Sequence, residues 1–547
     1  MENSRRRKAA QGLPKGNTVI LAAILSDLIM LLGRIPFMRM LGEVGTGYYA
    51  AVYEMFVFVM IFIGWYLPQA EGKAVRARVS RGQMKNASRV FKGTLLFAAG
   101  AGLLVCLATV CFSGRIAEKL LLQPLLSLAV CIMAPAFFLS AVISVYRGYF
   151  EGMGTVAPTF ISRILEQVFQ FGFGLIFAKI LYNYGEKVGK LKQNPNCAPA
   201  YGVMGVAVGM IAAQVLVLVF LLFINKSYDP VFRRRRMEDN SRIQESYADI
   251  IRSVIVLGMP QLAMLLFIKG SVFIDMLLYF HYIHKNTTQN YTLHYGSFYE
   301  KYGILMGILV CLLCFLMVKP LAALGQSHRR EDYRAVKEKF AGTIHTFCIY
   351  GIPAAILLAF LAKPVTDMLY GTVKGTVFLI QVSSSLLVMI PCAIFFSYCL
   401  QTVGKQAFVL RNCAIAFGVH VVFVLLFLRV MHLGIASAAY GYMVLFGLIM
   451  ILNGMTLFRY LKYSPEYIRM FGVPVTASLI SGLLAMLLSK ALLEKAGGIV
   501  TSAICIVLGM AGYIALLFAL KGVNEKELSR IPGGVILIKI GQLLHFF

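Results

Sequence analysis

The chain has 547 residues, of which 59% are hydrophobic and 14% are charged, with a mean hydropathy of +0.77 and a net charge of +28. A soluble globular chain has roughly 25% charged residues, so this composition excludes a soluble globular protein. Only helices and closed barrels satisfy their backbone hydrogen bonds in lipid. The long, non-alternating apolar runs therefore predict an all-α, polytopic membrane protein.

About fourteen stretches of roughly 20 or more mostly apolar residues follow one another along the chain, each long enough to cross a membrane as a helix. The first resembles a signal peptide because Arg5, Arg6, Arg7 and Lys8 precede it. It contains Asp27, however, and lacks a small-residue cleavage site, so we expect it to be retained. The predicted spans are 17–40, 47–69, 91–112, 124–147, 156–181, 203–224, 250–280, 298–319, 341–362, 375–401, 407–428, 435–458, 470–492 and 499–520.

The basic residues predict how the chain is oriented. With the N-terminus inside, about 36 of the 52 basic residues fall in inside loops and tails, which is the bias expected of cytoplasmic segments. We therefore expect a multi-pass protein of a bacterial plasma membrane with both ends in the cytoplasm. Basic loops such as 233–236 would then lie against anionic lipids, which explains the charge without a nucleic acid partner.

Two pairs of sequence features recur about 250 residues apart. Phe91 and Phe340 each follow a basic loop that enters a helix, and Gly154 and Gly404 each lie in a tight loop that ends a helix. A parallel repeat of six helices predicts two lobes with a substrate site between them. The expected parts are an N-lobe (1–224), a basic linker (225–249), a C-lobe (250–460) and two further helices with the C-terminal tail (461–547).

Charged residues inside the predicted helices are the first candidates for function, since they are costly in lipid. Arg34 and Arg39 lie in the first helix and Lys269 lies in the seventh. Cations facing a cavity would attract an anion such as pyrophosphate, with arginine offering a bidentate fork. The alternative is internal pairing, with Asp27 for Arg34 and Asp275 for Lys269.

Other polar groups fall on the second and fifth helices. Glu54 can neutralise Arg34 or Arg39 in a structural salt bridge, or it can bind a coupling cation. The fifth helix carries Arg163, Glu166, Gln167 and Gln170 on one face, which fits a cavity lining or bonds between helices equally well. The candidate substrate-binding residues are Arg34, Arg39, Glu54, Glu166, Gln170, Lys269 and Asp275.

Several motifs for other chemistry are missing from the sequence. It contains no phosphate-binding Gly-Lys-Ser/Thr loop and no HExxH, and its eleven cysteines lie mostly in apolar runs, where they read as packing residues. We therefore expect no cofactor and no enzymatic activity. A coupling cation, sodium or a proton, and the membrane potential remain candidates for the energy source.

Several segments resemble the multidrug/oligosaccharidyl-lipid/polysaccharide (MOP) flippase superfamily, and within it the stage V sporulation protein B and lipid II flippase branch. They are GRIPFMRMLGEVGTGYYAAVY (33–53), RGQMKNASRVFK (81–92), YRGYFEGMGTVAPTFISRILEQ (146–167) and the segment 371–406. The resemblance implies two six-helix lobes around a cationic cavity and alternating access. It also implies an undecaprenyl-pyrophosphate-linked glycan or lipid II as cargo, with Arg34 and Lys269 in the basic site.

The leading hypothesis is a monomeric flippase that moves an anionic, lipid-linked oligosaccharide or peptidoglycan precursor to the outer leaflet. A multidrug cation exporter of the same superfamily is the first alternative, supported by Asp27, Glu54, Glu166 and Asp275. A membrane glycan polymerase or ligase is the second, against which the short external loops argue.

Overall fold

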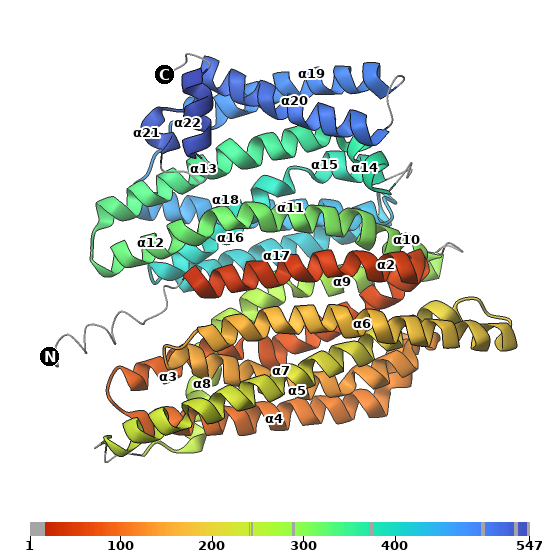
Figure 1. Cartoon of the computed structure of the whole chain (residues 1–547), viewed down its shortest axis with the longest axis vertical. Helices are drawn as coiled ribbons and strands as arrows, with labels where there is room; N and C mark the ends of the chain where they lie inside the picture. Colours follow the sequence, from red (N-terminus) through yellow and green to blue (C-terminus); the bar gives the residue numbers. More distant parts are fainter. Residues whose placement is uncertain are drawn as a thin grey trace. The chain divides into compact units, whose positions relative to one another are not determined.

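The computed structural model describes residues 17–239, 241, 244–286, 290–370, 376–493, 498–529 and 534–543, whose regular elements are all helices (Figure 1). The all-α, multi-pass membrane architecture is therefore confirmed. The basic residues 5–8 and the segment 371–375 lie outside the described residues.

The chain divides by its contacts into two compact units, Met1–Glu300 and Lys301–Phe547. The first contains α2 (Asn17–Met60), η1 (Ile61–Trp65), α3 (Leu67–Val79), α4 (Met84–Arg115), η2 (Ile116–Leu120), η3 (Pro124–Leu126), α5 (Ser127–Gly152), α6 (Ala157–Lys192), α7 (Cys197–Met237), α8 (Tyr247–Ile268), α9 (Gly270–Asn286) and α10 (Tyr291–Ser297). The short π-helix η4 (Phe298–Gly303) contains the boundary between the units.

The second unit begins at that boundary, and its regular elements in the described residues are also helices. It contains α11 (Ile304–Cys314), η5 (Phe315–Met317), α12 (Val318–Arg329), α13 (Tyr333–Phe360), α14 (Ala362–Tyr370), α15 (Thr376–Ser383), α16 (Leu386–Thr402), α17 (Gln406–Arg429), α18 (Ala436–Leu461), η6 (Ile468–Gly472), α19 (Val473–Leu493), α20 (Gly498–Ala519), α21 (Glu525–Leu528) and α22 (Gly534–Leu543).

The number of membrane spans follows from these helices. Within the described ranges, twelve helices are long and apolar enough to cross a membrane, and the bent pair 376–383 and 386–402 makes a thirteenth. The first candidate, Ile20–Val79, has 60 residues, or about 90 Å at 1.5 Å per residue, far more than one membrane core of about 30 Å. Gly42, at φ 70° and ψ 178°, interrupts it and separates the first two predicted spans.

Several helices run past the ends that hydropathy predicted. The second predicted span ends at 69, whereas the helix continues through α3 to Val79, and α7 reaches Met237 instead of 224. Hydropathy falls where charged residues begin, but Lys, Arg and Glu are good helix formers and let the helix continue. The predicted seventh helix, 250–280, is divided at Lys269 into α8 and α9.

The 250-residue repeat is visible in the turns that follow α5 and α16. The backbone N–H groups of Met153, Gly154 and Thr155 donate to the carbonyls of residues 149, 151 and 150, and those of Val403, Gly404 and Lys405 donate to residues 399, 401 and 400. Both turn glycines have positive φ, 87° and 77°. The first compact unit nevertheless includes α8, α9 and α10, so the predicted lobe boundaries stay a prediction.

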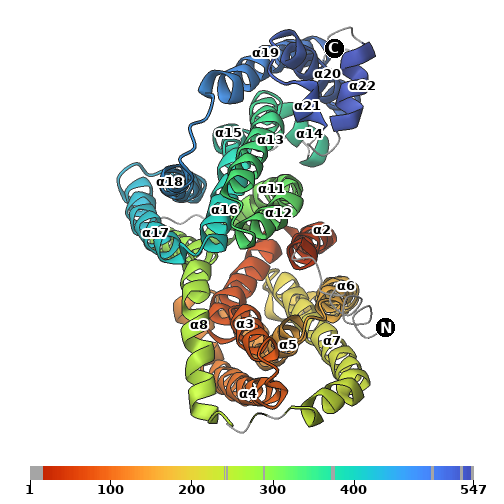
Figure 2. The same cartoon turned by 90° about the vertical axis from the view of Figure 1, so that its left-hand side faces the viewer.

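Each unit has its own apolar core. In the first unit, α3, α4, α5 and α8 pack together (Figure 2), and the buried side chains include Leu67, Val90, Phe150 and Ile250. In the second unit, α19 and α20 pack on each other and α13 packs on α19. The Tyr513 hydroxyl of α20 donates to the Ile349 carbonyl of α13 at 2.9 Å, which ties the two C-terminal spans to the unit.

Candidate functional site

A buried arginine on α2 is the centre of the site. The Arg34 side chain lies in the first unit, and the residue is only 6% exposed. Its Nη1 donates to the Tyr299 hydroxyl at 2.7 Å, and that hydroxyl donates to Glu54 Oε1 at 2.8 Å. One tyrosine therefore bridges the cation and the carboxylate.

Aromatic rings enclose the same guanidinium. The Arg34 Cζ atom lies 4.4 Å from the centre of the Tyr53 ring, 5.4 Å from that of Tyr299 and 5.7 Å from that of Tyr49. Ring faces attract a cation, so they stabilise the charge without neutralising it. Among the described residues, Arg34 forms no direct ion pair, with Asp27 or with any other acid, and its Nε has no hydrogen-bond partner.

Two glycines allow Tyr299 to reach Arg34. A Cβ atom on Gly296 of α10 would collide with the Glu43 carbonyl of α2, and one on Gly47 of α2 would collide with Thr292. The absence of side chains lets the two helix backbones approach closely. Because η4 follows α10 directly, this contact carries Tyr299 over α2.

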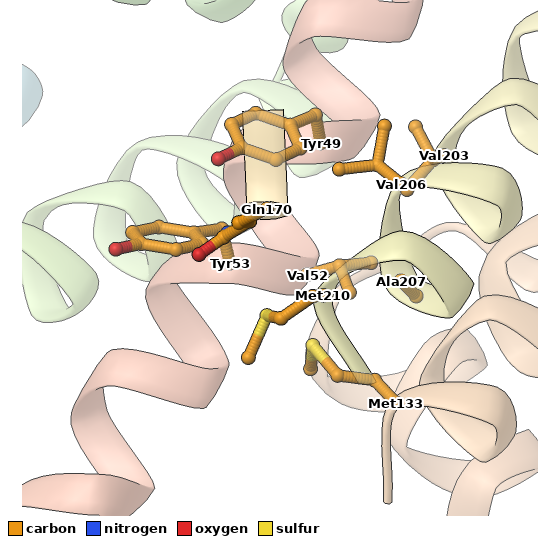
Figure 3. A pocket seen from close by; sticks show the side chains of 9 residues that line it. All are labelled: Tyr49, Val52, Tyr53, Met133, Gln170, Val203, Val206, Ala207 and Met210. Carbon is orange, nitrogen blue, oxygen red and sulfur yellow. The ribbon is translucent and has the colours of Figure 1, made fainter. Parts of the chain in front are cut away.

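A small pocket lies beside Tyr49 and Tyr53. The rings of Tyr49 and Tyr53 are stacked with centres 5.5 Å apart. In Figure 3 their hydroxyls point to one side and the apolar side chains of α7 lie on the other. The pocket is lined by Tyr49, Val52, Tyr53, Met133, Gln170, Val203, Val206, Ala207 and Met210. The wall is mostly apolar, and the Gln170 amide adds a polar group.

The remaining predicted residues are distributed around the first unit. Lys269 lies at the break between α8 and α9, is exposed, and acts electrostatically on Glu54. Asp275 is buried on α9, whereas Arg39 is exposed on α2. Glu166 is occupied by an ion pair with Arg147 at 2.7 Å. Arg34, Glu54, Gln170 and Lys269 are thus near the tyrosines or their partners, while Glu166 is paired with Arg147 and Arg39 is exposed.

The three tyrosines were missing from the sequence-based candidates. A spacing of four residues places side chains on one face of a helix, and both Tyr49/Tyr53 and Tyr291/Tyr295/Tyr299 have that spacing. This pattern is the signal that would have found them. In the part of the chain that the structure describes, no group of three His, Cys, Asp or Glu side chains is arranged to hold a metal ion.

Comparison with known proteins places this site in a family context. Residues 15–322 match the sequence model described as "Polysaccharide biosynthesis protein". The chain is 22% identical to stage V sporulation protein B of Bacillus subtilis (strain 168), over 96% of this chain and 98% of that protein. It is also 22% identical to the uncharacterized membrane protein YabM of the same strain, over 95% of both chains.

Solved transporters share the fold. A MOP superfamily transporter from Pyrococcus furiosus matches with a TM-score of 0.56 at 14% identity, over 83% of this chain and 98% of that one. A multidrug resistance MATE family transporter of the MOP superfamily, in an inward-facing conformation, matches with a TM-score of 0.57 at 12% identity, over 88% and 97%. At this identity the likeness concerns the fold alone.

Proposed function

We propose that this chain, which belongs to the polysaccharide biosynthesis protein family, moves an anionic lipid-linked oligosaccharide or peptidoglycan precursor across the membrane. It is a membrane transporter and not an enzyme. The cargo class we propose is an undecaprenyl-pyrophosphate-linked glycan or a lipid II-like molecule, carried from the inner to the outer leaflet by alternating access. The setting we propose is a bacterial plasma membrane, with both termini in the cytoplasm and a monomeric transporter.

The observation that supports this proposal is the buried cation of Arg34, which no carboxylate contacts directly among the described residues. A pyrophosphate oxygen can accept from the free Nε and, by replacing the Tyr299 hydroxyl, from Nη1 as well. Tyr299 keeps its hydrogen bond to Glu54 in that arrangement. The exposed Lys269 amine supplies a second positive charge nearby.

The membrane potential favours this direction of transport. An inside-negative potential contributes about 2.3 kcal/mol per elementary charge per 100 mV. The free energy of an anionic head group therefore falls as it moves outward. No ATP is needed for that step. We propose the potential as the energy source, with sodium or a proton as the candidate coupling cation.

Transport of a labelled lipid-linked precursor in proteoliposomes tests the proposal. Hydrogen bonds to charged groups contribute about 1.5–3 kcal/mol, so we expect Arg34→Ala to slow flipping by roughly 10- to 100-fold. Arg34→Lys keeps the charge but loses the fork, and we expect an intermediate rate. Lys269→Ala should lower the rate less, because the amine is exposed.

The matched control is Arg115→Ala, since Arg115 is an exposed arginine at the end of α4. It should flip cargo at the wild-type rate. Flipping by correctly folded Arg34→Ala protein at that same rate would contradict the proposal. Export of an organic cation that requires Glu54 but not Arg34 would replace it with the multidrug exporter.

A further inference from the structure

Glu71 of α3 lies buried in the contact between α3 and α5. Its side chain is 0% exposed, and neither carboxylate oxygen has a hydrogen-bond partner among the described residues. A Cβ atom on Gly148 of α5 would lie 2.8 Å from Glu71 Oε2. The carboxyl group is therefore pressed against the backbone of the neighbouring helix.

A second carboxyl group faces the same contact. Glu151 of α5 is 9% exposed, and its Oε1 has no hydrogen-bond partner in the described part of the chain. Its charge acts on Glu71. Two acids are thus held together inside the protein, where like charges cannot both be ionised without a large cost.

The surrounding charges distinguish the two acids. Arg76, Arg147 and Arg163 all act electrostatically on Glu151, and Arg76 Nη2 donates to the Glu151 carbonyl at 3.0 Å. The charge that acts on Glu71 is the negative charge of Glu151. Glu151 is therefore compensated as an anion, and Glu71 is not.

The other ionisable groups around this contact have separate partners or are exposed. On α5, Tyr149 interacts electrostatically with Glu71. Among the charged side chains on the elements packed around α3 and α5, Arg78 pairs with Glu245, Arg236 with Asp229 and Arg147 with Glu166. Arg89 donates to the Glu245 backbone carbonyl and to the Gln244 side chain, and Lys73, Lys92, Asp249 and Arg252 are exposed. None of these pairs neutralises Glu71.

We propose that Glu71 carries a proton in this conformation, and that the Glu71–Glu151 pair is a proton-binding site that holds α3 against α5. Release of the proton from the Glu71 carboxyl to water leaves two carboxylates in one buried contact, and their repulsion separates the helices. A proton fits better than a metal cation, because a hard cation requires about six oxygen ligands and the helical carbonyls here already accept backbone hydrogen bonds. This site does not depend on the identity of the cargo.

Infrared difference spectroscopy of the purified protein in lipid nanodiscs tests the site directly. A protonated carboxyl group has a carbonyl-stretch band that disappears on deprotonation. We expect wild-type protein to show such a band well above the pH range of a free glutamate, which is about 4.3. Glu71→Gln should lose the band, whereas Glu118→Gln, at an exposed glutamate of η2, should keep it.

Glu151→Gln keeps the test decisive if Glu71→Gln does not fold. It removes the negative charge that acts on Glu71, so the midpoint of the band's pH titration should move to lower pH by about one unit or more. A band that is absent from wild-type protein near neutral pH, that survives Glu71→Gln, or that ignores Glu151→Gln would overturn the proposal.

Thermal unfolding at several pH values gives a second readout. Glutamine resembles a protonated glutamate, so Glu71→Gln should match wild-type stability at low pH. As pH rises, the unfolded wild-type chain releases this proton and the folded chain retains it, so wild-type stability falls relative to the variant. A variant that is less stable than wild type by the same amount at every pH would show that Glu71 is an ionised structural group, against the proposal.

Discussion

The ends of α5 and α16 have the same backbone hydrogen bonds, but the side chains there are charged in α5 and neutral in α16. The turns after them share three hydrogen bonds at an offset of 250 residues, and both contain a glycine with positive φ. In the first unit Arg147 and Glu151 precede the turn, whereas Ser397 and Gln401 stand at the equivalent positions of the second unit. Glu166 on the following helix is matched by Ala416.

The neutral version shows that the turn does not require charges. In the second unit, Asn453 accepts from Asn412 at 2.9 Å and donates to the Ser397 hydroxyl at 2.9 Å. Hydrogen bonds between neutral side chains are therefore present next to a turn with the same backbone. The buried charges of the first unit are therefore additions to the shared fold, which is the expected pattern when ionisable groups inside a membrane protein serve function.

The largest expected effect comes from breaking the charged version. Glu166→Ala leaves the Arg147 cation buried without its carboxylate, and removing one partner of a buried pair costs about 3–5 kcal/mol of unfolding free energy. The double variant Arg147→Ser with Glu166→Ala copies the neutral residues of the second unit and should recover much of the loss. Unfolding titrations in mixed micelles measure both.

The control for this pair is the single change Arg147→Ser, which should also be destabilising. If the two single losses simply added in the double variant, the residues would not act as a pair. The charged interior would then not be an addition to a fold that tolerates neutral groups.

Breaking the neutral version should cost less. Asn453→Ala removes one acceptor and one donor from buried partners in the second unit, and each unsatisfied buried group costs about 1–3 kcal/mol. We expect a loss smaller than that of Glu166→Ala in the same unfolding titration. An equal or larger loss would mean that uncharged hydrogen bonds hold this interior as firmly as the ion pair holds the other.

The turn glycines should respond equally in the two units. A side chain at positive φ costs about 1–2 kcal/mol, and no neighbouring atom lies within 4 Å of a Cβ built on Gly404. Gly154→Ala and Gly404→Ala should therefore lower the unfolding free energy by similar amounts. A difference of more than about 1 kcal/mol between them would indicate that the turns are not equivalent, since backbone strain alone is the same.

The smallest effect concerns the segment after α7 in the first unit, where Asp239 accepts two backbone hydrogen bonds. Burial alone would raise the pKa of Asp239. The hydrogen bonds from the backbone N–H groups of Lys85 and Ser241, both 2.7 Å, lower it by more, so the pKa lies below its ordinary value. A lowered carboxyl pKa contributes stability above the ordinary value of about 3.9 that is lost as pH falls through the folded-state pKa. Asp239→Asn should remove this acid-side dependence from the thermal unfolding temperature, and a variant that retained it would place its origin elsewhere.

Sequence patterns predicted the spans and the two glycine turns because hydropathy and positive-φ glycines are local signals. They placed Glu71 in a loop, since the predicted second helix ended at 69 and Glu71 begins a charged stretch. The helix continues through that stretch and buries the carboxyl group. The contact of Tyr299 with Arg34 depends on the close approach of Gly47 and Gly296, which are far apart in sequence, so no local pattern reveals it.

The central claim is that the buried cation of the first unit binds an anionic head group, and equilibrium binding tests it most directly. Undecaprenyl pyrophosphate and uncharged undecaprenol differ only in the head group, so the ratio of their affinities for the purified protein measures binding of that group. We expect wild-type protein to prefer the pyrophosphate by roughly 10-fold or more, and Arg34→Gln to lose that preference while it binds undecaprenol unchanged. Equal preference in wild-type and Arg34→Gln protein would contradict the claim.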